Sequence, residues 1–304
     1  MSFASGRTLC RRALLVGLPL CAAVLGAAPG MAAGAEDLGW IIEPSDAREL
    51  LAGGALLLDA RAADLRATNP VTGAVAVDWR QFTEPEWPRR GTLLADDAVL
   101  SQRLQQLGVS NGRAVVVIGD PLEGWAEDAR VAWTLRTLGH DRAHVVNGGA
   151  AALLAAGPIT VARVPEGDFV VARSTAYEAT QQQVRAALGQ EDVIFLDARE
   201  PREFAGGTPY GESRAGHLPG ARPLYFRDLI AADGRVLQGM ALAEKLSALG
   251  VQQGARVVAY CSGGVRAAFV TMVLRDAGID ARNYAGSMWE WSAAPAETFP
   301  LVVE

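Results

Sequence analysis

Lysine is almost absent from the chain, and negative charge predominates. Lys245 is the only lysine among 304 residues, and the formal net charge at pH 7 is −6. Proteins that bind nucleic acids need a surplus of cationic side chains to neutralise phosphates. The net negative charge therefore argues against a nucleic acid as a partner.

Cysteine is equally scarce, and its distribution indicates export. Cys10 and Cys21, two of the three cysteines, lie within the first 35 residues. That segment has no acidic residue, and it combines arginines with an apolar run over 13–28 and a small-residue motif at 33–35. This order is typical of a secretory signal peptide. We expect residues 1–35 to be removed and the mature protein to lie in the periplasm.

The same segment leaves alternatives open. A membrane anchor is disfavoured because the apolar run is shorter than the ~20 residues that span a bilayer. No stable membrane anchor is therefore expected once the signal peptide is cleaved. Cleavage after Ala33 is the alternative to cleavage after Ala35. The pair Arg11-Arg12 leaves both Sec and twin-arginine export open.

Removal of the signal peptide leaves Cys261 as the only thiol. A single cysteine cannot form an internal disulfide, even in an oxidising compartment. A buried, inert cysteine is the alternative interpretation, and it is a common role for this residue. The two glycines that follow Cys261 favour a reactive thiol instead.

Histidine is the third scarce residue. His140 and His144 run from a predicted helix end into a strand, with no cysteine or acidic cluster beside them, so no metal site is expected. His217 stands beside Pro219 and Gly220. We expect it to be structural and to hold a turn near the site, with proton transfer as the alternative.

A repeat organises the rest of the chain. The segment 57–61 matches 195–199, and both contain Asp-Ala-Arg. The apolar segment 115–118 matches 257–260. Further matches follow in the same order, which indicates two copies of one domain rather than a solenoid.

Breaks in the pattern place the domain boundary. Glycines and prolines interrupt regular structure between residues 156 and 168. We predict an N-terminal domain over 36–156, a linker over 157–168 and a C-terminal domain over 169–304.

The fold class follows from apolar strands that alternate with helical patterns. In the second copy, strands are predicted over 192–196 and 255–260, and helices over 241–249 and 265–277. Thr175 with Glu178, a predicted capping box, should start the first helix of this copy. The pattern indicates an α/β fold in which each domain has a mostly parallel sheet flanked by helices on both faces. Reactive groups lie at the carboxyl ends of such strands.

Cys261 comes directly after one of these strands. Gly263 and Gly264 allow the loop to curl with its N–H groups inward, at the positive end of the next helix. Arg266 adds a fixed positive charge. These features stabilise a thiolate or an anionic persulfide, so we predict Cys261 and Arg266 as catalytic. The predicted substrate-binding loop comprises Ser262, Gly263, Gly264 and Val265.

Four motifs together resemble the tandem-domain rhodanese family of thiosulfate and 3-mercaptopyruvate sulfurtransferases, in an exported form. They are Asp197-Ala198-Arg199-Glu200 with Glu203-Phe204, Gly216 to Ala221, Cys261 to Arg266, and Tyr284 to Trp289. The resemblance implies that Cys261 accepts a sulfur atom from thiosulfate or 3-mercaptopyruvate as a persulfide. It then passes the sulfur to cyanide or a thiol. No metal or organic cofactor is implied.

The first copy departs from this pattern. Ile118 is followed by Gly119-Asp120 without a cysteine. We expect this copy to be catalytically silent, to cover the active loop and to build one wall of its pocket.

Loop length and side-chain identity leave some choices open. Four residues separate Cys261 from Arg266, whereas related phosphatases have five, which disfavours phosphatase activity. The donor is undecided, because Arg266 stands where mercaptopyruvate enzymes usually have threonine. Glu203 likewise replaces an arginine that binds substrate in several relatives. A low-turnover module that delivers persulfide sulfur to a periplasmic protein is the alternative function.

Several other side chains have a structural and a functional interpretation. Asp197 and Arg199 recur in the silent copy, which favours a structural role near the site for Asp197. We predict that Arg199 binds substrate, with a structural role as the equal alternative. Arg214 is a weaker candidate for anion binding. Trp289 and Trp291 are expected to pack in the core or between domains rather than to line the pocket.

Overall fold

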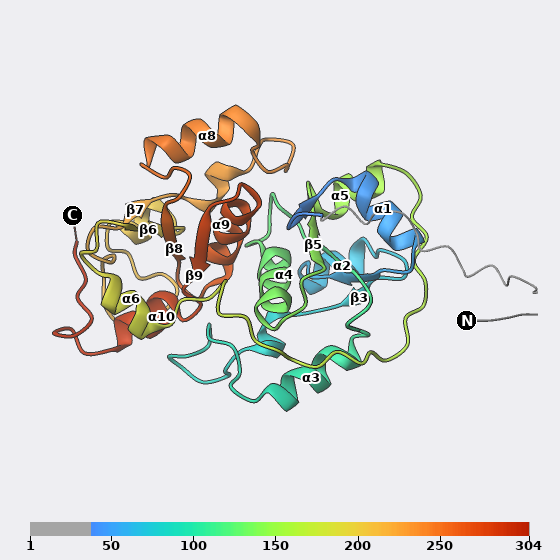
Figure 1. The fold of residues 1–304 in the computed structure, drawn as a ribbon, viewed down its shortest axis with the longest axis horizontal. Coiled ribbons are helices and arrows are strands. Elements are labelled where there is room, and N and C mark those ends of the chain that lie inside the picture. The colour runs from blue at the N-terminus through green and yellow to red at the C-terminus, as the bar shows by residue number, and fades with distance from the viewer. Residues whose placement is uncertain (1–37, 304) are drawn as a thin grey trace, which may run out of the picture. The chain divides into compact units, whose positions relative to one another are not determined.

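The computed structural model describes residues 38–303, which contain two parallel β-sheets. The predicted signal peptide lies outside the described residues. The first sheet has the order β1-β5-β4-β2-β3, and the second has the order β7-β6-β8-β9 (Figure 1). The strands are β1 (Ile41–Ile42), β2 (Leu56–Asp59), β3 (Val75–Ala76), β4 (Val115–Ile118), β5 (Ala143–Val146), β6 (Val193–Asp197), β7 (Arg222–Pro223), β8 (Arg256–Tyr260) and β9 (Asp280–Asn283).

Helices accompany both sheets in matching order. Those of the first half are α1 (Pro44–Ala52), α2 (Ala63–Thr68), η1 (Trp79–Phe82), α3 (Asp97–Gln106), α4 (Glu127–Thr137) and α5 (Gly149–Ala155). Those of the second half are α6 (Gln181–Ala187), α7 (Pro201–Phe204), η2 (Phe226–Leu229), α8 (Gly239–Ala248), α9 (Val265–Asp276) and α10 (Ser287–Ala293). The predicted α/β fold class is confirmed.

The central strands are apolar because helices cover both of their faces. Every residue of β2 and β4 is buried, as is every residue of β8 after Arg256. Continuous apolar runs of this kind are typical of parallel sheets. Among residues 38–303, no helix is both long enough and apolar enough to cross a membrane.

Helices α4 and α9 join the two halves. They follow equivalent strands, β4 and β8, and they lie side by side between the sheets (Figure 1). Both helices are buried over most of their length. One hydrophobic cluster contains side chains from both halves, including Val117 and Ala259. The loop that follows β8 is therefore built against the first half of the chain.

The connection between the halves corrects one prediction. The capping box at Thr175 and Glu178 was wrong, since α6 begins at Gln181 and Thr180 caps it. The chain before Thr180 stays extended because it pairs with the end of β9: Ala179 N–H donates to the carbonyl of Asn283 at 3.0 Å. These edge hydrogen bonds outweigh the local helix signal.

Candidate active site

Cys261 lies at the carboxyl end of β8, between that strand and α9. Its side chain is buried, with 1% of the residue exposed, and it lines a cavity of about 170 Å³. The N–H of Gly264, at the start of α9, donates to Sγ of Cys261 at 3.1 Å. The structure thus brings the thiol to the positive end of a helix, where a sulfur anion is stabilised.

Two glycines shape the loop around the thiol. Gly264 has φ of +76°, a conformation that favours glycine. A Cβ on Gly263 would overlap the indole ring of Trp289. The aromatic side chain therefore packs directly on the loop backbone at Gly263. A Cβ on Gly264 would instead overlap the backbone of Ala285 and the guanidinium of Arg130.

Ser287 fixes the backbone of Cys261 from the other side. The N–H of Cys261 donates to Oγ of Ser287 at 3.0 Å, and the Ser287 hydroxyl donates to the carbonyl of Tyr284 at 2.6 Å. Ser287 adopts φ of +51°, which is strained for any residue other than glycine. We did not predict this role from the sequence. The sequence did contain an indication of the unusual backbone at Ser287, because glycine (Gly149) occupies the matching position in the first half.

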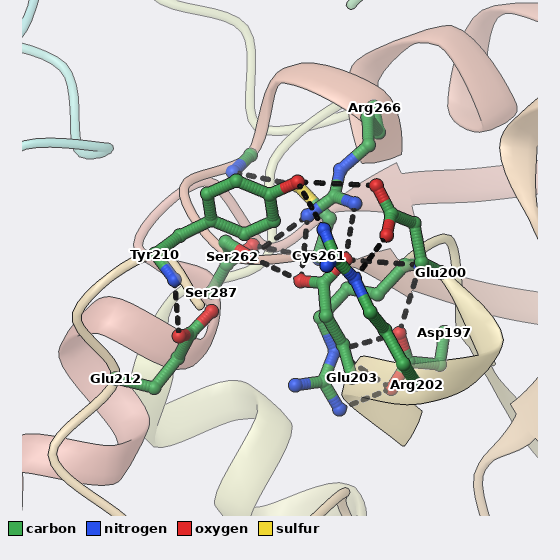
Figure 2. Close-up of polar contacts among 12 residues, drawn as sticks. Asp197, Glu200, Arg202, Glu203, Tyr210, Glu212, Cys261, Ser262, Arg266 and Ser287 are labelled. Carbon is green, nitrogen blue, oxygen red and sulfur yellow. Dashed lines mark hydrogen bonds and ion pairs between the residues drawn. The ribbon is translucent and has the colours of Figure 1, made fainter. Parts of the chain in front are cut away.

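Arg266 is held in a buried network with Glu203 and Ser262 (Figure 2). Its two terminal nitrogens donate to the two carboxylate oxygens of Glu203 at 2.6 and 2.9 Å. The hydroxyl of Ser262 accepts from Arg266 at 2.7 Å and donates to Glu203 at 2.7 Å. Glu203 is fully buried. The sequence analysis noted it within a family motif and as a replacement for a substrate-binding arginine, and it did not predict the pair with Arg266.

Opposing effects set the charge states of this pair. Burial would raise the pKa of Glu203, but the hydrogen bonds and charge of Arg266 lower it overall. Burial likewise opposes the charged form of Arg266, but Glu203 and the neighbouring Cys261 raise its pKa overall. Both groups are therefore ionised at neutral pH, and Glu203 balances the positive charge that we predicted Arg266 would add beside the thiol.

The first half of the chain reaches the loop through Arg130 of α4. This guanidinium is fully buried, and it donates to the carbonyl of Gly264 at 3.0 Å and to that of Gly91 at 2.6 Å. It also lies 4.6 Å from the ring centre of Trp133. Burial lowers the pKa of Arg130 to about 10. Arg130 thus holds the residue whose N–H contacts Cys261.

Both halves build the cavity walls. Four aromatic side chains line the cavity: Trp79 and Trp125 of the first half, and Tyr210 and Trp289 of the second. Trp289 packs against the core, as expected, and it also lines the cavity, which was the less favoured interpretation; Trp291 is in the core. The hydroxyl of Tyr210 donates to the carboxylate of Glu200, and its backbone N–H donates to the carboxylate of Glu212, at 3.1 Å in each case (Figure 2).

Asp197 and Arg199 form a buried ion pair at 2.7 Å. Arg199 also donates to the carbonyl of Gly216 at 3.0 Å, and it is not among the residues that line the cavity. The same geometry recurs between Asp59 and Arg61 of the first half. This arrangement fits the structural role that we predicted for Asp197. It does not fit our prediction that Arg199 binds substrate, because the guanidinium is used by Asp197 and Gly216 and lies outside the cavity lining.

His217 and Arg214 also hold backbone in place. The His217 ring bonds the carbonyl of Phe204 at 2.9 Å and stacks on the Phe204 ring at 3.7 Å. The Arg214 guanidinium donates to four carbonyls near the C-terminus, those of Trp291, Ser292, Ala294 and Phe299. Within residues 38–303, no group of three His, Cys, Asp or Glu side chains is placed to hold a metal ion.

A cysteine at the end of a parallel strand and at the start of a buried helix is the kind of environment in which a thiol can act as a nucleophile. The sequence profile described as rhodanese-like domain matches residues 180–294. A thiosulfate sulfurtransferase of Pseudomonas aeruginosa is 33% identical over 85% of this chain and 96% of its own length. A probable 3-mercaptopyruvate sulfurtransferase of the same species is 35% identical over 66% of this chain and 72% of its own.

The solved structure of the Tum1 protein from Saccharomyces cerevisiae has the same fold. It superposes with a TM-score of 0.72 at 18% identity, over 88% of this chain and 98% of its own. The chain belongs to the rhodanese family, and it is a sulfurtransferase enzyme. A small-molecule sulfur donor and a small acceptor fit this assignment.

Proposed function

We propose that Cys261 carries sulfur as a persulfide from thiosulfate or 3-mercaptopyruvate to cyanide or a thiol. The observation that carries this proposal is the position of its Sγ, in a cavity and 3.1 Å from the N–H of Gly264 at the start of α9. A negative charge on sulfur, either as thiolate or as persulfide, is stabilised there.

The first step loads the enzyme. The Cys261 thiolate attacks the outer sulfur of thiosulfate, a new S–S bond forms, and sulfite leaves with the electrons of the broken S–S bond. With 3-mercaptopyruvate, the C–S bond breaks instead, and the enolate of pyruvate leaves and takes a proton from water. Both donors leave the same Cys261 persulfide.

The second step regenerates the enzyme. Cyanide or a thiolate attacks the outer sulfur of the persulfide, and the Cys261 thiolate leaves. The N–H of Gly264 can contact the sulfur anion before and after transfer. Arg266 contributes positive charge next to the loop, and its pair with Glu203 keeps the guanidinium in one orientation.

Parallel steady-state assays with the two donors test this proposal. Wild-type protein should form thiocyanate from cyanide with at least one donor. Cys261→Ala should form none, while its circular dichroism spectrum and melting temperature stay close to those of the wild type. Full activity in this variant would refute the role of Cys261.

A delivery module with little turnover is the second candidate. The observation that favours it is the burial of Cys261, with 1% of the residue exposed, which would shield a persulfide from solvent. Intact-mass measurement separates the two functions. An adduct of about +32 Da that cyanide does not remove supports delivery to a protein acceptor, whereas rapid loss supports catalysis.

We also propose that the protein works in the periplasm. The composition of residues 1–35 supports this proposal, with arginines before an apolar run and no acidic residue. Expression of the full chain should give a periplasmic protein whose N-terminal residue is Glu36. A cytoplasmic protein that retains Met1 would contradict it.

A further inference from the structure

The charged groups of the cavity are unequally compensated. Three charged side chains line it: Arg80, Glu127 and Arg266. Arg266 is paired with Glu203 at 2.6 Å, and Arg80 is paired with Asp78 at 3.2 Å. No ion pair joins Glu127 to a cation of residues 38–303; one of its oxygens accepts from the N–H of Trp125 at 2.8 Å. Among the three charged side chains that line the cavity, Glu127 alone therefore has no ion-pair partner within residues 38–303.

The aromatic walls of the cavity favour a positively charged ligand, as Glu127 does. Indole and phenol rings present electron-rich faces, which attract organic cations. Arg266 already uses two of these rings, at 5.3 Å from Trp125 and 5.4 Å from Tyr210. Trp79 and Trp289 also line the cavity. A small ligand in this cavity meets aromatic faces on several sides and the carboxylate of Glu127, which has no ion-pair partner within residues 38–303.

We infer that the physiological sulfur acceptor is a small thiol with a positively charged group, that is, an aminothiol. This inference rests on the proposed persulfide of Cys261. The acceptor thiolate attacks the outer persulfide sulfur, the acceptor leaves as a persulfide, and the Cys261 thiolate is restored. The ammonium group is held by Glu127 and the aromatic walls.

Three thiols with one carbon frame and different charge test the inference. The full protein is loaded with sulfur from its better donor, and transfer is followed in single turnover by loss of the mass adduct. The acceptors are 2-aminoethanethiol, 2-mercaptoethanol and 2-mercaptoethanesulfonate, with rates normalised to the thiolate concentration of each. We expect second-order rate constants to fall in that order, by about three- to tenfold per step.

Glu127→Gln supplies the critical variant, because the amide keeps an acceptor for the Trp125 N–H and removes the charge. The rate ratio of the ammonium thiol to the sulfonate thiol should fall about tenfold in this variant. Glu123→Gln is the matched control, since Glu123 is exposed on the same loop and outside the cavity lining. It removes the same charge and should leave the ratio as in the wild type.

The possible outcomes distinguish failure of the aminothiol inference from failure of the proposed function on which it rests. If neither donor loads Cys261, the proposed function fails and the acceptor inference fails with it. If the persulfide forms but the three thiols react equally, or the sulfonate reacts fastest, only the aminothiol inference is overturned. An equal fall of the ratio in Glu123→Gln and Glu127→Gln would also overturn it, because net charge and not the cavity would then set the preference.

Discussion

Strands β4 and β8 occupy the same place in their two sheets, but the loops after them are built differently. Each leads to a helix whose capping residue has positive φ, +65° at Ala126 and +76° at Gly264. Cys261 follows β8, whereas Gly119 follows β4. The backbone plan is thus shared, and the chemistry is not.

The second residue of each helix carries the opposite charge. In α9 this residue is Arg266, paired with Glu203; in α4 it is Asp128, which is buried without an ion-pair partner among residues 38–303. The Asp128 carboxylate fills the space beside Gly119, where a Cβ would overlap it. The loop after β4 therefore lacks the space for a cysteine side chain as well as the cation.

The first half, although it lacks the cysteine, contributes side chains to the Cys261 loop and to its cavity. Helix α4 sends Arg130 across to the carbonyl of Gly264, and η1 and the loop before α4 supply Trp79 and Trp125 to the cavity. The first half therefore acts as a support and wall for the active loop, as we predicted.

The largest effect should come from removing the charge that distinguishes the two loops. Arg266→Met leaves the buried Glu203 carboxylate unpaired, which should lower the free energy of unfolding by about 3–5 kcal/mol. Sulfur transfer should fall at least about 100-fold, because charge stabilisation at the sulfur is lost. Urea unfolding and the thiocyanate assay measure these two effects.

A double variant separates stability from activity at this site. Glu203→Gln added to Arg266→Met removes the unpaired charge and should recover most of the lost stability. Activity should stay low. Recovery of activity together with stability would show that Arg266 serves only as the partner of Glu203.

Asp128, the second residue of α4, should make the free energy of unfolding depend on pH. Burial raises its pKa from the ordinary 3.8 to about 7, so the folded state binds more protons than the unfolded state between these values. The contribution of Asp128 to stability is therefore present below about pH 4 and is lost as pH rises through about 7. Asp128→Asn should raise the free energy of unfolding by roughly 2–4 kcal/mol at pH 8.5 relative to the wild type.

The control for Asp128 is again the exposed Glu123. Urea unfolding of Asp128→Asn and Glu123→Gln at pH 4.5 and 8.5 isolates the buried group. The gain should appear only in Asp128→Asn and should shrink at the lower pH. A gain that is the same at both pH values would assign the effect to packing rather than to charge.

Substitution of Arg130 tests whether the contact from α4 to Gly264 matters for sulfur transfer. Arg130→Met removes a charged hydrogen bond to Gly264, and sulfur transfer should fall about 10- to 30-fold in kcat with little change in KM. Arg136→Met is the matched control, because Arg136 is buried on the same helix but bonds the carbonyls of Ala143 and Gly39 instead. An equal loss of kcat in both variants would show that α4 acts only through stability.

Short-range features of the site were predictable from the sequence. The strand before Cys261 and the helix after it agree with the predicted bounds to within one residue, because apolar patterning and glycine stops are local signals. The position of Cys261 at a strand end followed from them.

Long-range features were not predictable, because they depend on how the two halves pack. Glu203 and Arg130 lie 63 and 134 residues from the groups that they bond in the loop. Residue type alone did not show that Trp289 faces the cavity whereas Trp291 faces the core. Thr175 was a false helix start for a similar reason, because pairing with β9 decided the conformation there.

The smallest effect should come from Ser287, where the active half has a strained serine and the silent half has Gly149. Ser287→Ala loses the bond to the Cys261 N–H and keeps the strain, so it should lower the free energy of unfolding by about 1–2 kcal/mol. Ser287→Gly loses the bond but relieves the strain, and it should be about 1 kcal/mol more stable than the alanine variant.

Activity separates the two contributions of Ser287. Both variants should transfer sulfur about three- to tenfold more slowly, because each frees the Cys261 backbone equally. Urea unfolding and single-turnover transfer measured on the same preparations would provide the comparison. If the glycine variant retains wild-type rates, the hydrogen bond from the Cys261 N–H to Ser287 contributes to stability and not to catalysis.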